Sequence, residues 1–219
     1  LSILHLLKEN SAVSGGKILY EGSSVAHASS QDLQRIRGKE ISMIFQEPMT
    51  SLNPVLAIEE QIAEGLLIHE SCTPAERHEK VLAIMHEVEL PDPEKLCKKY
   101  PHQLSGGQRQ AVTLLMATLK KPKLLLLDEH TAALDPKTAL KVLTLSAKIV
   151  EENHLTTMMI THNMKDAIKY GNRLIMMHEG HIIYDVSGDE KKNLQVSDLL
   201  AKFQIASGGE FANDRMILS

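Results

Sequence analysis

Four consecutive leucines at positions 124–127 run directly into two acids, Asp128 and Glu129. An apolar run without polar alternation is typical of a strand that is buried on both faces, as in the centre of a parallel sheet. Parallel neighbours are joined by helical crossovers, so this run predicts an α/β fold. The two acids then lie at the carboxyl end of a central strand, where open α/β sheets bind their ligands.

Two further apolar segments end in a polar side chain in the same way. Residues 40–45 lead to Gln46, and residues 157–161 lead to His162. Because carboxyl ends of parallel strands share one edge of a sheet, these side chains are expected beside the two acids.

Helical periodicity fills the segments between the predicted strands. Apolar residues recur at helical spacing from about Ile58 to Cys97, and again from about Pro136 to Asn153. A hairpin is predicted to turn at Glu179-Gly180, and a last helix lies near residues 196–204. We therefore predict a mostly parallel sheet that is covered by helices.

Composition narrows the possible classes of function. The 219 residues carry a formal net charge of −4, which gives no global attraction for nucleic acid, so nucleic acid is not a predicted partner. No apolar run reaches the roughly 18 residues of a membrane span, so any membrane role is expected to be peripheral. Cys72 and Cys97 show no C-x-x-C spacing, and we predict neither a disulfide nor a zinc site.

A phosphate-binding loop of the form G-x-x-x-x-G-K-[ST] is absent from the sequence. The Gly-Gly-Lys at residues 15–17 resembles one superficially, but Ser11 stands at the place of the first glycine and Ile18 at that of the Ser or Thr. We interpret residues 15–22 as a turn, a short strand and a second turn. Residues 1–7 begin abruptly with helical spacing and no cap, as a helix entered midway would.

A segment of small and polar residues precedes another helix with apolar spacing: Leu104, Ser105, Gly106, Gly107 and Gln108. Its hydroxyl and backbone N–H groups are then at a helix N-terminus, where the helix dipole favours an anion, so the segment predicts a phosphate seat. The alternative is an ordinary turn in which the serine caps the helix. Residues 207–210, Ser-Gly-Gly-Glu, are interpreted as such a turn.

The acids and the imidazole can divide the work of phosphoryl transfer. Asp128 can hold Mg²⁺ through its water shell, while Glu129 orients or deprotonates the attacking water. His162 would hydrogen-bond the terminal phosphate or the water, and the Gln46 amide would lie near the metal. Taken singly, each pattern also fits a solvated acidic turn or a structural histidine. The other ten of the 11 histidines show no H-E-x-x-H spacing and are interpreted as structural.

In this order the segments resemble the ATP-binding subunit of ABC transporters, and the resemblance covers essentially the whole chain. Gln46 is similar to the Q-loop glutamine of that family, residues 104–108 to its signature motif and residues 124–128 to its Walker B motif. Glu129 is similar to the catalytic glutamate and His162 to the switch histidine.

The resemblance implies a P-loop NTPase-like ABC ATPase fold, truncated at the N-terminus, with a small antiparallel part. It implies a single domain over residues 1–219, with a helical subdomain at about residues 47–110. It also implies ATP and Mg²⁺ as cofactors, with Gln46 sharing the metal with Asp128. Residues 132–135 resemble the D-loop, where Asp135 is retained and is expected among the residues that bind the nucleotide. Ala132 replaces the usual serine, so a hydroxyl contact across the dimer would be missing.

Two subfamilies share the resemblance. The chain resembles ATPases of oligopeptide, dipeptide and nickel importers from Leu1 to about His102. From about residue 111 to residue 219 it resembles an uncharacterised group of amino-acid-type importers. We therefore hypothesise a mosaic that is joined between about Tyr100 and Ala111.

The resemblance also implies partners. Because the Walker A loop would precede Leu1, this chain alone is expected neither to bind ATP tightly nor to turn it over. In a complete parent, two ATPase subunits, identical or different, meet head to tail across two nucleotides, and each nucleotide faces Ser105, Gly106 and Gly107 of the other subunit. Residues 47–61, Glu47 to Gln61, are expected to contact transmembrane permease subunits at the cytoplasmic face of the membrane, with a solute-binding protein as an indirect partner.

Two alternatives come from other functional classes. A soluble ABC ATPase for translation or repair would share the signature and Walker B segments, but paired cassettes, coiled-coil arms and basic patches are not visible in the sequence. A catalytically inactive interaction module would differ from the enzyme only in what lies upstream of Leu1.

Overall fold

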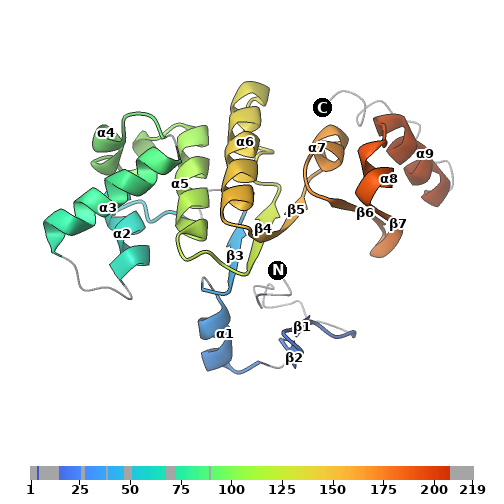
Figure 1. Cartoon of the computed structure of the whole chain (residues 1–219), viewed down its shortest axis with the longest axis horizontal. Helices are drawn as coiled ribbons and strands as arrows, with labels where there is room; N and C mark the ends of the chain where they lie inside the picture. Colours follow the sequence, from blue (N-terminus) through green and yellow to red (C-terminus); the bar gives the residue numbers. More distant parts are fainter. Residues whose placement is uncertain are drawn as a thin grey trace. The chain divides into compact units, whose positions relative to one another are not determined.

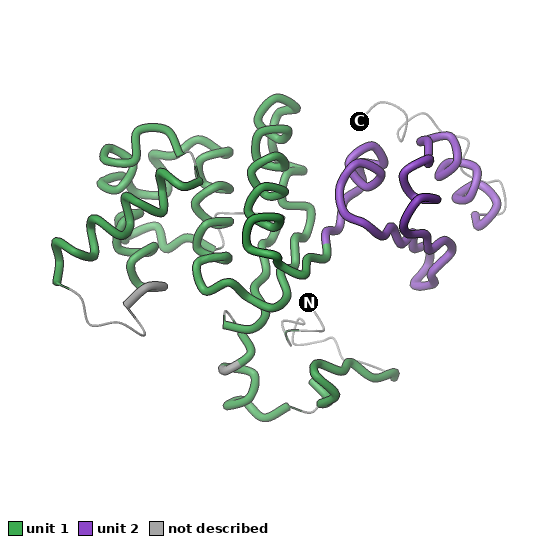
Figure 2. Tube along the Cα trace, in the orientation of Figure 1, with its two compact units in different colours: residues 1–158 green, residues 159–219 purple. Residues whose placement is uncertain are grey.

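The computed structural model describes residue 4 and residues 15–25, 28–37, 39–46, 51–67, 73–88 and 90–207. The chain forms two compact units, Leu1–Met158 and Met159–Ser219 (Figure 2). The predicted helix at residues 1–7 lies outside the described residues except for Leu4, which is buried. The single domain predicted from the sequence stays a prediction.

The central sheet has the strand order β3, β4, β5; β3 and β4 belong to the first unit, and β5 runs across the boundary between the units. These strands are β3 (Ile41–Ile44), β4 (Leu124–Asp128) and β5 (Thr156–Ile160). β3 pairs with β4 in parallel, in a register that runs from Ile41 opposite Leu124 to Ile44 opposite Leu127. Ile44 and Leu125 are completely buried, as the apolar runs require. The prediction of an α/β fold with a parallel sheet is confirmed.

Two long helices pack against each other beside this sheet (Figure 1). α5 (Gly106–Thr118) buries Leu114 and Leu115, and α6 (Pro136–Glu152) buries Val142 and Ile149. α6 begins one residue after Asp135, with Pro136 at a position where its missing N–H costs nothing.

Helices fill the chain between β3 and β4 (Figure 1). They are α2 (Ile58–Leu67), α3 (Pro74–Glu87), α4 (Pro93–Cys97), a 3-10 turn at Pro101–Gln103, and α5. Their shared core contains side chains with no measurable exposure, namely Ile58, Ile62, Val81 and Met85. α5 continues to Thr118, beyond residue 110, so the bounds 47–110 for a helical subdomain stay a prediction.

A short hairpin and a helix precede the sheet. β1 (Leu19–Tyr20) and β2 (Ser23–Ser24) pair antiparallel around Glu21 and Gly22, whose φ angles of 48° and 80° make a tight turn; α1 (Ser30–Ile36) follows. The Tyr20 hydroxyl donates to Glu40 Oε2 at 2.9 Å, and burial together with this bond raises the pKa of Tyr20 to about 12. Lys123 Nζ lies 2.7 Å from Glu21 Oε1 and 3.0 Å from Glu40 Oε2, which ties the hairpin to the sheet.

The second unit is built on an antiparallel hairpin of β6 (Arg173–His178) and β7 (His181–Ser187). The hairpin turns at Glu179 and Gly180, with φ angles of 48° and 79°, as the sequence predicted. The helices in the described part of this unit are α7 (Met164–Lys169), α8 (Gly188–Lys192) and α9 (Val196–Ala206). Its core consists of buried aliphatic side chains, Leu174, Val186, Leu194 and Leu199.

Within the described residues, no helix is both long enough and apolar enough to span a lipid bilayer.

Candidate functional site

The ends of β3 and β4 bring together three of the predicted site residues. Ile44 pairs with Leu127, and the two strands are parallel, so Gln46 and the acids Asp128 and Glu129 leave the sheet at the same edge. Gln46 lies in an exposed bend, whereas the two acids are partly buried. The edge therefore presents amide and carboxylate oxygens, the donor set that Mg²⁺ prefers in proteins.

Glu129 adopts an unusual backbone conformation. Its φ of 46° places a non-glycine residue in the left-handed region, which costs about 1–2 kcal/mol. The turn is held by Ala132 N, which donates to Glu129 O at 3.0 Å, and by Leu134 N, which donates to Thr131 O at 3.1 Å. Glu21 and Glu179 adopt the same conformation at hairpin turns, and at Glu129 it turns the chain from β4 toward α6.

His130 follows Glu129 and is 2% exposed. Its Nε2 lies 3.1 Å from Ser146 Oγ, and that hydroxyl donates to Val142 O at 2.8 Å. Burial lowers the pKa of His130 to about 4, so the imidazole is neutral at pH 7. The sequence shows no sign of this role for His130. No local pattern links a histidine that follows two acids to a serine 16 residues further along the chain.

The predicted phosphate seat forms the N-terminus of α5. Ser105 is the N-cap, with its hydroxyl accepting from Gln108 N at 3.2 Å, and Gln108 Oε1 accepts from Ser105 N at 3.0 Å. The two residues thus form a reciprocal capping box. The capping role that the sequence left open is therefore present. Ser105 is also exposed, so it stays accessible at the positive end of the helix dipole.

Gly106 and Gly107 pack closely on the segment that follows the acids. A Cβ atom on Gly107 would lie 2.4 Å from Thr138 Cγ2, and one on Gly106 would lie 3.1 Å from Leu134 Cδ2. The first distance is far inside van der Waals contact. The second glycine of the segment is therefore required by helix packing.

Asp135 is the N-cap of α6 and accepts from Thr138 N at 3.1 Å. Hydrogen bonds from the Thr138 side chain and backbone lower the pKa of Asp135, which keeps the exposed carboxylate charged. Ala132, which stands where the family's D-loop serine is expected, is exposed. The role of Asp135 at a nucleotide stays a prediction.

His162 follows β5 by two residues and belongs to the second unit. It is exposed, and Asn163 beside it caps α7 by accepting from Lys165 N at 3.0 Å and from Asp166 N at 3.2 Å. Because the two units are not placed relative to one another, the predicted approach of His162 to Glu129 stays a prediction.

A parallel sheet with an amide and two acids at the carboxyl edge is typical of α/β proteins that bind nucleotides. The family model for ABC transporters matches residues 2–132. The chain therefore belongs to the ABC transporter family of ATP-binding proteins, and the predicted resemblance is confirmed.

Similar proteins are transport ATP-binding proteins. The chain is 42% identical to the peptidoglycan transport ATP-binding protein YejF of Agrobacterium fabrum, over 83% of this chain and 34% of that protein. It is 36% identical to the oligopeptide transport ATP-binding protein OppD of Escherichia coli, over 82% of this chain and 53% of OppD. The chain thus spans between a third and about half of the length of these two relatives.

A relative of another kind matches more of the chain. The tyrosine transport ATP-binding protein of Clostridioides difficile is 38% identical over 92% of this chain and 78% of that protein. An alignment of this extent runs through residues 100–111, so one relative accounts for both halves, and the hypothesis of a mosaic stays a prediction.

Solved structures agree on the fold. The chain superposes with a TM-score of 0.68 on the dimeric ATP-binding cassette MJ0796 bound to ADP and Pi, at 27% identity, over 81% of this chain and 75% of that one. It also superposes on cbiO1 from Clostridium perfringens with a TM-score of 0.71 at 24% identity, which bears on the fold alone. The predicted ABC ATPase fold is thereby confirmed.

Proposed function

We propose that this chain is the ATP-binding part of a subunit that energises import of peptides or another small solute at the cytoplasmic face of a membrane. The observation that carries the proposal is the register of β3 with β4, which leads Gln46, Asp128 and Glu129 to one sheet edge in a member of the ABC transporter family. The similarity to oligopeptide and tyrosine transport ATP-binding proteins supports a role in transport of small solutes.

The oxygens of the sheet edge fit a Mg-nucleotide. Bound Mg²⁺ would neutralise charge on the transferring phosphoryl group. Asp128 would hold the ion through water, with Gln46 beside it, because carboxylate and amide oxygens suit a hard cation. Glu129 would orient or deprotonate the attacking water, and His162 would hydrogen-bond the terminal phosphate. These roles are proposed residue by residue from the family resemblance.

The signature side of the chain would serve a second ATPase subunit. Ser105 is exposed at the N-terminus of a 13-residue helix, so its hydroxyl and the helix dipole can face an anion on another molecule. The similarity to a dimeric cassette bound to ADP and Pi supports this arrangement. ATP would then be bound between two subunits, and its hydrolysis would separate them.

A pre-ordered loop before α2 is the proposed contact with permease subunits. Gln61 is buried, and its Nε2 donates to Asn53 O at 3.0 Å and to Leu56 O at 2.9 Å, while its Oε1 accepts from Asn53 N at 2.8 Å. Val55 at the tip of this loop is 75% exposed. A loop held by these hydrogen bonds, with an exposed apolar tip, supports docking by residues 51–61. Residues 47–50 of the predicted segment lie outside the described residues.

A polypeptide of these 219 residues has no phosphate loop, so we propose that it does not turn over ATP by itself. It retains Ser105, Gly106 and Gly107, so it would complete the nucleotide site of an intact homologous subunit. One working site would form in each mixed dimer. That site would use the phosphate loop and catalytic glutamate of the intact subunit together with the signature segment of this chain.

The test mixes this chain with an intact homologue whose own signature serine is replaced by Asp, so that the homologue's homodimer is inactive. We expect ATP-dependent association by light scattering and restored hydrolysis. Ser105→Asp in this chain should abolish both, whereas Glu129→Gln should leave hydrolysis unchanged because Glu129 faces the site without a phosphate loop. Absence of ATP-dependent association would contradict the composite site. Hydrolysis by this chain alone that Glu129→Gln abolishes would contradict the proposed inactivity.

A further inference from the structure

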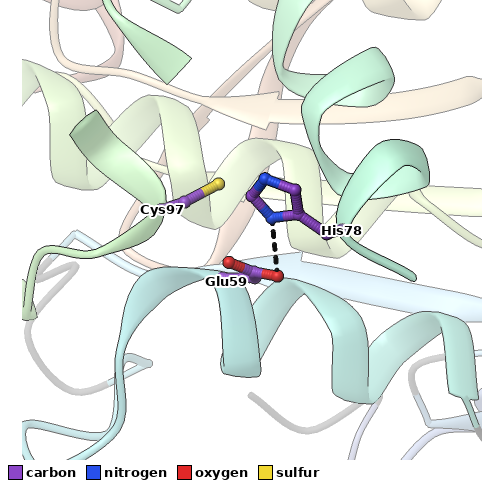
Figure 3. Close-up of side chains that lie close together, drawn as sticks. All are labelled: Glu59, His78 and Cys97. Carbon is purple, nitrogen blue, oxygen red and sulfur yellow. Dashed lines mark hydrogen bonds and ion pairs between the residues drawn. The ribbon is translucent and has the colours of Figure 1, made fainter. Parts of the chain in front are cut away.

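Three potential metal ligands converge in the helical region, away from the sheet edge. Glu59 lies on α2, His78 on α3 and Cys97 at the end of α4, and their side chains point toward one another (Figure 3). One ligand atom of each residue, a carboxylate oxygen, an imidazole nitrogen and the thiol sulfur, can be chosen so that all lie within 4.8 Å of one another. Glu59 Oε1 and His78 Nδ1 are already 2.9 Å apart.

The surroundings of the three side chains differ in a way that suits an ion. Cys97 is completely buried, and its Sγ lies 3.6 Å from the thioether sulfur of Met85, which is also buried. The side chains of His78 and Glu59 are 41% and 21% exposed. An ion can therefore enter from the solvent side of the imidazole and reach the sulfur at the bottom of the cluster.

We propose that Glu59, His78 and Cys97 bind one Zn²⁺ ion. Sulfur, imidazole nitrogen and carboxylate oxygen form the mixed set that zinc takes, whereas Mg²⁺ and Ca²⁺ prefer oxygen alone. In a tetrahedral zinc site, ligand atoms are roughly 3.4–3.6 Å apart, as follows from bond lengths of about 2.0–2.3 Å. The cluster reaches that spacing when the Glu59 and His78 atoms, now 2.9 Å apart, separate by about half an ångström and the sulfur moves toward them by at most about 1.3 Å.

Zinc binding would exchange the existing contacts within the cluster for bonds to the ion. The Cys97 thiol loses its proton to solvent, and a Zn–S bond replaces the contact between its hydrogen and the Met85 sulfur. His78 loses its Nδ1 hydrogen to solvent and takes one up on Nε2, so that the Nδ1 lone pair can bind zinc. Glu59 binds through a carboxylate oxygen, and the two zinc bonds replace the hydrogen bond between His78 and Glu59. A water molecule from the exposed side takes the fourth position, as in zinc sites with three protein ligands.

The proposal departs from the expectation from the sequence, which predicted no zinc site. That expectation relied on the spacing of cysteines, but these ligands come from three helices, at positions 59, 78 and 97. Only the packing of α2, α3 and α4 brings them together. Zinc would fasten these three helices to each other, and this proposal does not depend on any nucleotide.

The test is zinc binding by the purified, metal-stripped 219-residue chain, measured by competition with a zinc-sensitive dye. We expect one tight site per chain, with affinity reduced at least about tenfold by His78→Gln or Glu59→Gln, since even loss of an outer hydrogen bond to a ligand costs that much. His86→Gln is the matched control, because His86 is an exposed histidine on the same helix and lies 3.5 Å from Glu94. Cys72→Ser is the control for the other cysteine. Both controls should bind zinc like the original chain.

Cobalt substitution reports the sulfur ligand directly and independently of folding energy. Co²⁺ should give a thiolate-to-metal charge-transfer band that Cys97→Ser abolishes and Cys72→Ser retains. Zinc in excess should raise the melting temperature of the original chain by roughly 5 °C and that of His78→Gln by much less. Unchanged zinc affinity in a folded His78→Gln chain, or a charge-transfer band that follows Cys72, would overturn the proposal.

Discussion

His130 shows how one buried side chain fixes the segment that carries the proposed catalytic acid. Its ring nitrogen lies 3.1 Å from the Ser146 hydroxyl on α6, so His130, the residue after Glu129, is held by the helix that begins six residues further on. The neutral imidazole supplies one hydrogen-bonding atom to a hydroxyl without placing a charge in the core.

The buried imidazole predicts that stability falls on acidification. The pKa of His130 is about 4 in the folded chain and near the ordinary 6.5 when unfolded, so between these values the unfolded chain binds more protons. Stability should therefore be fully present above about pH 6.5 and be lost progressively toward pH 4, by at most roughly 3 kcal/mol. Urea unfolding at pH 7.5 and pH 5.5 checks this, and His130→Asn should reduce the difference between the two pH values. An equal pH dependence in both chains would contradict the assignment.

Gly107 predicts a steric conflict that a second substitution relieves. Gly107→Ala would place a methyl group 2.4 Å from Thr138 Cγ2, and rotating Thr138 away would break its side-chain hydrogen bond to Asp135. We expect the clash to lower the free energy of unfolding by about 1–3 kcal/mol. The better helix propensity of alanine should offset part of this loss.

The double variant Gly107→Ala with Thr138→Ser should recover most of that loss, because serine keeps the hydroxyl and lacks the methyl group. Gly15→Ala is the control, since nothing lies within 4 Å of the added atom. If the effects of the two substitutions on the free energy of unfolding simply added in a double-mutant cycle, the contact with Thr138 would not be the cause of the destabilisation by Gly107→Ala.

At the scale of elements, helix N-termini organise the proposed site. Ser105 caps α5 and Asp135 caps α6. The glycines of α5 pack against Leu134 before α6 and against Thr138 in its first turn. Capping and phosphate binding use the same serine hydroxyl, so the structural and functional explanations of Ser105 can both hold. Substitutions that separate them are therefore informative.

Ser105→Ala should destabilise the chain by about 1 kcal/mol, because the backbone N–H of Gln108 loses its hydrogen-bond acceptor. Ser105→Asp should keep the stability, since aspartate caps as well as serine and its charge is favourable at a helix N-terminus. The same charge should repel a nucleotide phosphate and abolish ATP-dependent association with an intact cassette. Thermal unfolding and light scattering check the two effects separately. If Ser105→Asp kept normal association, the serine would be a cap alone.

At the scale of the whole molecule, the order of the motifs was readable from the sequence. Strands β4 and β5, the helix α6 and the hairpin at Glu179-Gly180 lie at or within one or two residues of their predicted positions, because uninterrupted apolar runs and turn dipeptides are local signals. β3 is one residue shorter at each end than predicted: Glu40 serves the ion pair with Lys123, and Phe45 begins the loop to Gln46.

The sequence by itself therefore determined the fold class, the family and the polar residue at the end of each strand, since these depend on periodicity and on residue order. Tertiary structure alone decided which side chains meet. It anchored His130 on Ser146, packed Gly107 against Thr138 and gathered Glu59, His78 and Cys97 from three helices. Such contacts depend on the angles and rotations at which helices pack, and these angles leave no periodic trace in the chain.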